Sequence, residues 1–280
     1  MERKHPMANA LWAAAAFIVV GAGTTPATAK EPCGDFGECK VLIEINATDG
    51  DIGFHFLMDG DDLNSAKIRD PNGETIFSDK AQGALREQKL TETFAESAEP
   101  FCKKALKEEK DDVVVGLVEF LNRWPAGRYV FKGKGDDETS KGKVRLKHKI
   151  PAAPASLAFD GSVISWSSGN NLGECASNAK LSNLVASGVL PVHPQNVRVV
   201  AWEVVFEPDV EDGDPTGNLV FSIRVAGNIG TKQVTVPAEY LAALPDNTPA
   251  KIEVGAIGVS DNATFTEADG FCINETTGCP

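Results

Sequence analysis

Three acidic stretches carry the residue types from which calcium sites are built. The candidate ligands are the pairs Asp49 and Asp51, Asp59 and Asp61, and Asp212 and Asp214. Calcium is a hard cation that takes about six to eight oxygen ligands, which aspartates and loop carbonyls supply. No pair completes the helix-loop-helix calcium pattern; Ile223 stands where the Asp212 stretch needs its bidentate glutamate. Loop sites are therefore the form of calcium binding that these residues suit, and the alternative is that Asp and Gly form simple turns.

The first two pairs flank a predicted strand. Its apolar residues repeat at every second position, which places them on one face. These residues are Ile52, Phe54, Phe56 and Met58. A strand of about seven residues spans roughly 23 Å, so the acidic pairs at its two ends cannot share one ion through it. Each pair would need further ligands from a neighbouring loop.

The other reactive side chains form no catalytic motif. Each histidine after residue 29 is interpreted as structural: His55 shares a strand face with Leu57, His148 lies beside an apolar face, and His193 lies between prolines. Nucleophile-elbow, zinc-protease and phosphate-loop patterns are absent from the sequence. The acidic residues are too numerous for a glycosidase pair to be identified. The sequence therefore predicts no catalytic residue and no cofactor apart from calcium.

The cysteines predict disulfides. An even number in an exported chain is typical of a disulfide framework, and no Cys-x-x-Cys spacing indicates a zinc ribbon or a redox motif. The residues are Cys33, Cys39, Cys102, Cys175, Cys272 and Cys279. Three precede and three follow residue 150, so full oxidation requires a bridge between the two sides. Short loops close most easily, which favours Cys33–Cys39 and Cys272–Cys279 with Cys102–Cys175 crossing, although other pairings stay open.

The first 29 residues have the pattern of a signal peptide. Arg3 and Lys4 give a basic start, Leu11–Gly21 is an apolar run, and Ala27-Thr28-Ala29 offers a cleavage site. The run is short for a membrane span, and no later segment is long enough for one; an N-terminal anchor is the alternative. The sequence therefore predicts a secreted or periplasmic protein without a membrane span after signal removal.

The chain is acidic, with a formal net charge of −13, and removal of residues 1–29 changes this to −14. Nucleic acids and anionic membranes would repel such a chain, so neither is an expected partner. The charge suits cations or basic partners, although a role in solubility explains it equally well.

Patterning predicts a mainly β fold with two antiparallel β-sandwich domains. The stretch IPAAPASL, residues 150–157, has the composition of an interdomain linker. Residues 30–150 are predicted to form a β-sandwich-like domain with a helix near 112–124, between two aspartates and Pro125. Residues 151–280 alternate with period two, with a long insertion near 168–196 and a cysteine-containing tail.

The second half resembles a fibronectin type III domain over residues 154–265. PASLAFDGSVISW is similar to the opening two strands, with Trp166 as the core tryptophan. VVAWEVVFE is similar to the third strand, and LPDNTPAKIEVGAIGVSDNATF to the last hairpin. Ala250 stands where the family's corner tyrosine is expected, and Ser168–Asn196 is a long segment between the second and third strands. In the first half, PAGRYVF is similar to secreted bacterial β-sandwich domains that accompany hydrolases.

Fibronectin type III domains are mostly spacers and binding modules, so the resemblance implies recognition rather than catalysis. The sequence therefore favours a non-catalytic binding or structural module of the cell envelope or extracellular space, recognising a protein or glycan. The alternatives are a secreted carboxylate-dependent hydrolase and a calcium-stabilised accessory domain of one. A hydrolase requires a cleft with converging carboxylates, whereas a binding module requires exposed patches.

Overall fold

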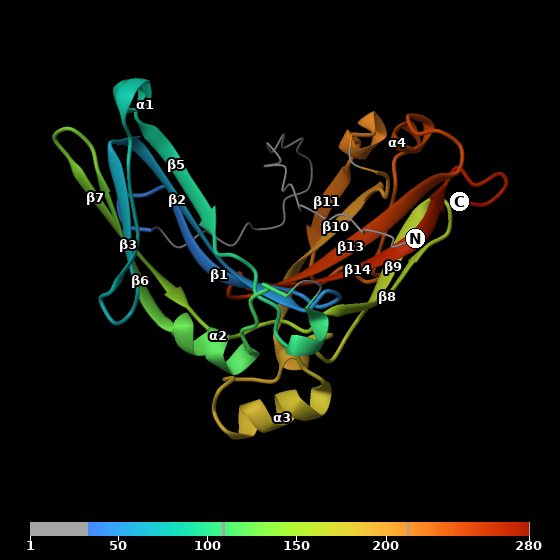
Figure 1. Ribbon diagram of the computed structural model, residues 1–280, viewed down its shortest axis with the longest axis horizontal. Coiled ribbons are helices and arrows are strands. Elements are labelled where there is room, and N and C mark those ends of the chain that lie inside the picture. The colour runs from blue at the N-terminus through green and yellow to red at the C-terminus, as the bar shows by residue number, and fades with distance from the viewer. Residues whose placement is uncertain (1–32, 108–109, 212, 280) are drawn as a thin grey trace. The chain divides into compact units, whose positions relative to one another are not determined.

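The computed structural model describes residues 33–107, 110–211 and 213–279, so the predicted signal peptide lies outside the described residues. From Pro32 onward the chain forms one compact unit. Within the described ranges, the strands form three sheets of seven, four and three strands. The predicted mainly β fold is confirmed (Figure 1).

The largest sheet has the strand order β11-β10-β13-β14-β1-β2-β5. Its strands are β1 (Glu38–Asn46), β2 (Asp51–Leu63), β5 (Leu90–Glu96), β10 (Val199–Pro208), β11 (Phe221–Ala226), β13 (Thr248–Gly258) and β14 (Ala263–Ile273). Neighbours are antiparallel except for β1 and β14, which pair in parallel. In Figure 1, blue β1 lies beside red β14. This parallel pair departs from the predicted antiparallel sandwiches, and it joins strands from both sides of the proline-rich stretch.

The two smaller sheets have the orders β4-β3-β6-β7 and β12-β9-β8. Their strands are β3 (Ser65–Arg69), β4 (Thr75–Lys80), β6 (Gly127–Lys134), β7 (Thr139–Leu146), β8 (Pro154–Phe159), β9 (Val163–Ser168) and β12 (Gln233–Thr235). All their strand pairs are antiparallel. The hairpin of β8 and β9 is where the fibronectin-like pattern places its first two strands, and Trp166 is buried as expected.

Helices are short. They are α1 (Gly83–Gln88), α2 (Leu117–Arg123), α3 (Asn178–Ala186) and α4 (Ala238–Ala242), with 3₁₀ turns η1 (Lys104–Leu106), η2 (Pro194–Asn196) and η3 (Pro215–Asn218). Helix α2 is the helix predicted near 112–124, but its first five predicted residues are not helical. Val114 forms a β-bridge with Phe101, and the Val115 amide donates to the Phe101 carbonyl at 2.9 Å. These tertiary hydrogen bonds keep the segment extended until Leu117.

The strands of the large sheet bury one face in two hydrophobic clusters. The predicted alternation in β2 is confirmed, because Ile52, Phe54, Phe56 and Met58 all lie in the first cluster. The second cluster takes Trp202 from β10, Val254 from β13 and Trp166 from β9. Leu172, Leu181 and Leu190 lie in the first cluster, so the predicted insertion at 168–196 packs with the first half of the chain.

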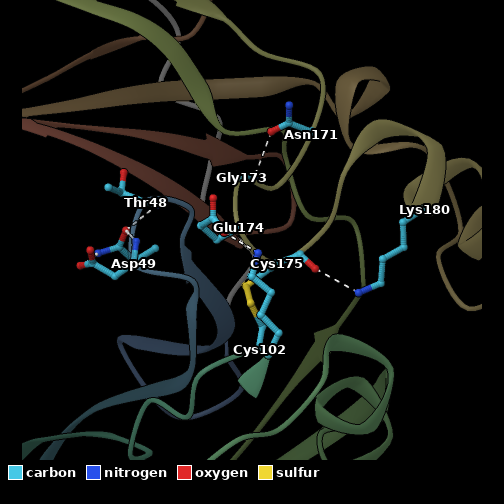
Figure 2. Close-up of a disulfide and its surroundings, with 10 residues drawn as sticks. Thr48, Asp49, Cys102, Asn171, Gly173, Glu174, Cys175 and Lys180 are labelled. Carbon is cyan, nitrogen blue, oxygen red and sulfur yellow. Dashed lines mark hydrogen bonds and ion pairs between the residues drawn. A yellow bond between two sulfur atoms is a disulfide. The ribbon is translucent and has the colours of Figure 1, made fainter. Parts of the chain in front are cut away.

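Three disulfides join Cys33 to Cys39, Cys102 to Cys175 and Cys272 to Cys279, the pairing favoured from loop length. Figure 2 shows the Cys102–Cys175 bridge beside the turn that joins β1 to β2. The Cys102 amide donates to the Gly50 carbonyl at 2.7 Å, and the Glu174 amide to the Ala47 carbonyl at 2.9 Å. Both sides of this bridge are therefore held against the same turn. The division into two domains near residue 150 stays a prediction. The β1–β14 pairing and the Cys102–Cys175 disulfide both connect the two sides of this boundary.

The stretch predicted as a linker is largely buried and attached to β14. Ile150 is 1% exposed. Thr264 Oγ1 donates to the Pro151 carbonyl at 2.7 Å, and Thr266 Oγ1 donates to the Pro154 carbonyl at 2.7 Å. Prolines and small residues fit here because the segment runs close along β14. A flexible linker would not make such contacts.

Candidate functional site

Side chains that alternate with the core residues line the other side of the seven-stranded sheet, which we call the polar face. The strand registers place the acidic residues of six strands on it. They are Glu38 and Glu44 (β1), Asp51 and Asp59 (β2), Glu92 and Glu96 (β5), Glu203 and Glu207 (β10), Glu253 (β13) and Glu267 (β14). The excess of acidic residues in the sequence is therefore gathered, in part, on one surface.

Cations neutralise one end of the polar face. Lys251 Nζ lies 3.2 Å from Glu207 Oε1 and 3.4 Å from Glu267 Oε2. Arg224 forms an ion pair with Glu203. Between these pairs, Glu253 lies directly across from Glu267, an arrangement in which two like charges repel. Burial, reinforced by the charge of Glu44, raises the pKa of Glu253 to about 8.

A second group of ionisable residues lies toward β5. Ligand atoms of Glu44, His55 and Glu99 all lie within 4.8 Å of one another. Glu44 on β1 is directly paired with Gly53 on β2, and His55 follows two residues later on the same face. A Cβ atom at Gly53 would lie 2.7 Å from His55 Nε2 and 2.8 Å from Glu99 Oε1. The glycine therefore provides the space in which the side chains meet.

Hydrogen bonds to the main chain of β2 position Glu99. The Ser97 amide donates to the Phe54 carbonyl at 2.8 Å, and the Phe54 amide donates to Ser97 Oγ at 3.0 Å. On the other side of Glu99, the Pro100 carbonyl accepts from the Ile52 amide at 3.2 Å. Glu99 is thus fixed between two anchor points on β2, opposite the gap left by Gly53.

His55 lies between two carboxylates. Its side chain is buried, Nδ1 lies 3.7 Å from Glu96 Oε2, and Nε2 lies 3.8 Å from Glu99 Oε1. Burial alone would lower the pKa of His55, but Glu99, Glu44 and Glu96 outweigh it and raise the pKa. Burial raises the pKa of Glu44 to about 7, partly offset by His55. The imidazole and the carboxylates therefore form one electrostatically coupled group.

The predicted calcium ligands occupy separate places. Asp49 lies in the turn after β1, where its Oδ2 accepts from Asn46 Nδ2 at 2.8 Å. Asp51 begins β2, while Asp59 and Asp61 lie near its other end, so the two pairs are apart as expected. Asp214 caps η3 by accepting from the Thr216 amide at 2.9 Å. Asp212 lies outside the described residues.

Burial and the charge of Glu99 raise the pKa of Asp51 to about 7. Asp51 and Asp59 belong to the polar face, which the sequence interpretation did not recognise as a common surface. Calcium binding at any of the predicted pairs stays a prediction.

The other two histidines have local roles. His148 Nε2 lies 2.8 Å from the Trp124 carbonyl, and burial lowers its pKa. His193 Nδ1 accepts from the Gln195 amide at 3.4 Å. Two surface hollows, of about 210 Å³ beside Trp202 and about 330 Å³ beside Arg145, have no acidic residue in their linings. Neither hollow therefore provides the converging carboxylates that the hydrolase alternative requires.

Glu44, Glu99 and Glu253 were not among the predicted site residues, and His55 was interpreted as structural. Strand alternation could have placed Glu44 and His55 on the face opposite Ile45 and Phe54, because successive side chains point to opposite faces. Glu99 lies in the loop after β5, where the alternation of strand residues gives no information about the position of a side chain.

No protein-family model matches the chain, and no curated protein matches it. Several solved structures are similar to it, among them two at low sequence identity. One is the BSP domain of a biofilm associated protein, at 10% identity and a TM-score of 0.22, covering 87% of this chain and 30% of that one. The other is a 1.5-MDa bacterial ice-binding adhesin, at 13% identity and a TM-score of 0.24, covering 89% of this chain and 66% of that one. These TM-scores are too low to carry an argument about fold or function.

Among the described residues, no helix has the length and apolar character needed to cross a membrane.

The stability of the protein is expected to fall as the pH rises from about 5 to above 8. A glutamate in an unfolded chain has its ordinary pKa of 4.5, whereas burial raises the pKa of Glu253 in the folded protein to about 8. Between these values the folded state keeps a proton that the unfolded state has lost, so rising pH favours unfolding. Replacing Glu253 with glutamine should remove this cost and stabilise the protein at pH 8.5 by on the order of 2 kcal/mol.

Urea unfolding of Glu253→Gln at pH 5 and pH 8.5, in chelator-treated buffer, measures this effect. Glu239→Gln, at an exposed position on α4, provides the control and should change stability little at either pH. Equal gains for the two variants at pH 8.5 would show that the effect is one of overall charge.

Proposed function

We propose that this chain is an exported, non-catalytic binding module, and that its polar face recognises a cationic protein partner. The observation that carries the proposal is the gathering of carboxylates from six neighbouring strands on one side of a continuous sheet. Complementary charge on a partner would steer the encounter and favour basic surfaces over acidic ones.

Three further features support this proposal. Three disulfides are typical of proteins that work in an oxidising compartment, in agreement with the predicted export signal. A sheet joined across its centre by β1 and β14 also gives the polar face a fixed spacing of charges. The β8–β9 hairpin and buried Trp166 support a fibronectin type III-like pattern in the second half, a family of mostly binding modules.

A lysine-rich peptide serves as a probe of the polar face. We expect it to bind at low ionic strength, and to bind more weakly as salt screens the interaction. The variant Glu92→Gln/Glu203→Gln/Glu267→Gln should lower the affinity by about tenfold or more, because it removes charge from three strands of the face. Fluorescence anisotropy in chelator-treated buffer gives the affinity.

The matched control is Glu138→Gln/Glu239→Gln/Glu275→Gln, which removes the same charge from exposed positions outside the sheet. It should bind the peptide nearly as well as the wild type does. If both variants lose affinity equally, the polar face has no special role. Binding of a neutral glycan that the three face substitutions leave unchanged would also contradict the proposal.

The calcium-stabilised alternative rests on the predicted aspartate pairs. Calorimetric titration with calcium tests it directly, since a protein without such a site gives no heat and no shift in melting temperature.

A further inference from the structure

The region around His55 has properties that a charged recognition surface does not require. His55 is only 6% exposed, and its Nε2 atom has no hydrogen-bond partner. A buried polar atom without a hydrogen bond is costly, so such atoms call for a physical explanation. Here Nε2 faces the carboxylates of Glu44 and Glu99, with ligand atoms of all three residues within 4.8 Å of one another.

We propose that Glu44, His55 and Glu99 bind a divalent transition-metal ion, with Zn²⁺ the best match. Zinc accepts nitrogen from histidine and oxygen from glutamate at about 2.0–2.2 Å, in a tetrahedral arrangement. The 3.8 Å between His55 Nε2 and Glu99 Oε1 is close to the separation of two ligand atoms on such an ion. Three protein ligands leave a fourth position for water or for a group from a partner.

The chemistry of the ligand set separates this site from the predicted calcium sites. Calcium and magnesium prefer oxygen ligands only, whereas imidazole nitrogen suits zinc and its transition-metal neighbours. None of the three residues belongs to the aspartate pairs predicted to bind calcium.

The surroundings of the three residues fit a metal centre as well. Histidine ligands generally direct their other ring nitrogen to a carboxylate or carbonyl, which orients the ring. Nδ1 of His55 faces Glu96 Oε2 at 3.7 Å, a contact that a small side-chain rotation would shorten to a hydrogen bond. Because Gly53 has no side chain, His55 Nε2 and Glu99 Oε1 can both approach its Cα, and the anchors at Ser97 and Pro100 fix Glu99 there. Strand pairing thus holds the ligands from β1 and β2, and hydrogen bonds to β2 hold Glu99 in the segment after β5.

Isothermal titration of the chelator-treated, disulfide-bonded protein with ZnCl₂ tests the site. We expect one ion per chain, with a dissociation constant in the micromolar range or below. Glu99→Gln should weaken zinc binding by at least about tenfold, since loss of even an outer-shell partner can cost that much. Because Glu99 lies in a partly exposed loop, this substitution leaves the core intact. Gly53→Ala should weaken binding too, since its Cβ would displace His55 or Glu99.

Glu92→Gln provides the matched control, because it removes one carboxylate from β5 on the same face but outside the cluster. It should bind zinc like the wild type. The ring signals of His55 in an NMR spectrum, assigned by their loss in His55→Gln, should shift when zinc is added. Absence of zinc binding, equal affinity in Glu99→Gln and wild type, or unmoved His55 signals would each overturn the proposal.

The metal titration uses no macromolecular partner, and the peptide experiment is carried out with chelator. Either proposal can therefore fail while the other stands.

Discussion

Replacing Asn262 with alanine is expected to lower the free energy of unfolding by about 3–5 kcal/mol, because it removes three hydrogen bonds of a fully buried side chain and leaves the buried Ile43 amide without an acceptor. Asn262 is fully buried just before β14 begins. Its Oδ1 accepts from the Ile43 amide at 2.9 Å, and its Nδ2 donates to the Lys147 carbonyl at 2.6 Å and the Lys149 carbonyl at 3.2 Å. One side chain therefore connects β1, the chain leading to the proline-rich stretch, and the β13–β14 turn.

The position of Asn262 explains the size of this effect. The parallel pairing of β1 with β14 begins at Glu44 and Ala263, so Ile43 has no strand partner on that side. The Asn262 amide supplies the missing acceptor and continues the ladder by one residue. An alanine would leave the Ile43 amide buried without a partner. Its methyl side chain has no polar atom that could accept the hydrogen bond in place of the Asn262 oxygen.

Thr264→Val is the matched control for this prediction. It is a nearly isosteric change at a fully buried residue two positions further on, in β14, and it removes a single hydrogen bond, from Oγ1 to the Pro151 carbonyl. We expect it to cost about 1 kcal/mol. Urea unfolding gives both values, and hydrogen exchange at the Ile43 amide should accelerate only in Asn262→Ala. A cost for Asn262→Ala no larger than that for Thr264→Val would contradict the proposed role.

Local pattern was sufficient to predict the strands, because one buried face imposes a period of two. Ile52 to Met58 in β2 and Trp202 to Phe206 in β10 both alternate in sequence and are buried as expected. The disulfide pairing also followed from local information, since two pairs of cysteines are separated by only 6 and 7 positions. Once these are paired, Cys102 and Cys175 have only each other.

Contacts between distant segments were not predictable in the same way. The pairing of β1 with β14 joins strands at opposite ends of the chain, and neither strand's own pattern specifies a parallel neighbour. Helix α2 begins later than expected because Val114 pairs with Phe101, a residue from an earlier segment that the local pattern does not connect to it. The metal cluster depends on both kinds of information, since β1–β2 register brings Glu44 to Gly53 but only tertiary hydrogen bonds bring Glu99 there.

Removing the Cys102–Cys175 disulfide is expected to destabilise the protein by about 4 kcal/mol. The bridge closes a loop with a sequence separation of 73, so its loss gives the unfolded chain considerable freedom. The double variant Cys102→Ala/Cys175→Ala suits the site because both residues are buried in the first hydrophobic cluster, where a serine hydroxyl would lack a partner. Urea unfolding without reductant measures the change.

The double variant Cys272→Ala/Cys279→Ala is the control. Its bridge closes a loop with a sequence separation of only 7, near the end of the chain, and the same entropy argument gives a loss of about 2 kcal/mol. The larger loss for Cys102→Ala/Cys175→Ala should be accompanied by faster hydrogen exchange around Gly50 and Glu174, whose backbone hydrogen bonds involve or adjoin the bridged residues. If the two variants lose equal stability, loop length does not govern the contribution of these bridges. If exchange near Gly50 stays slow, the backbone contacts hold the turn without the crossing disulfide.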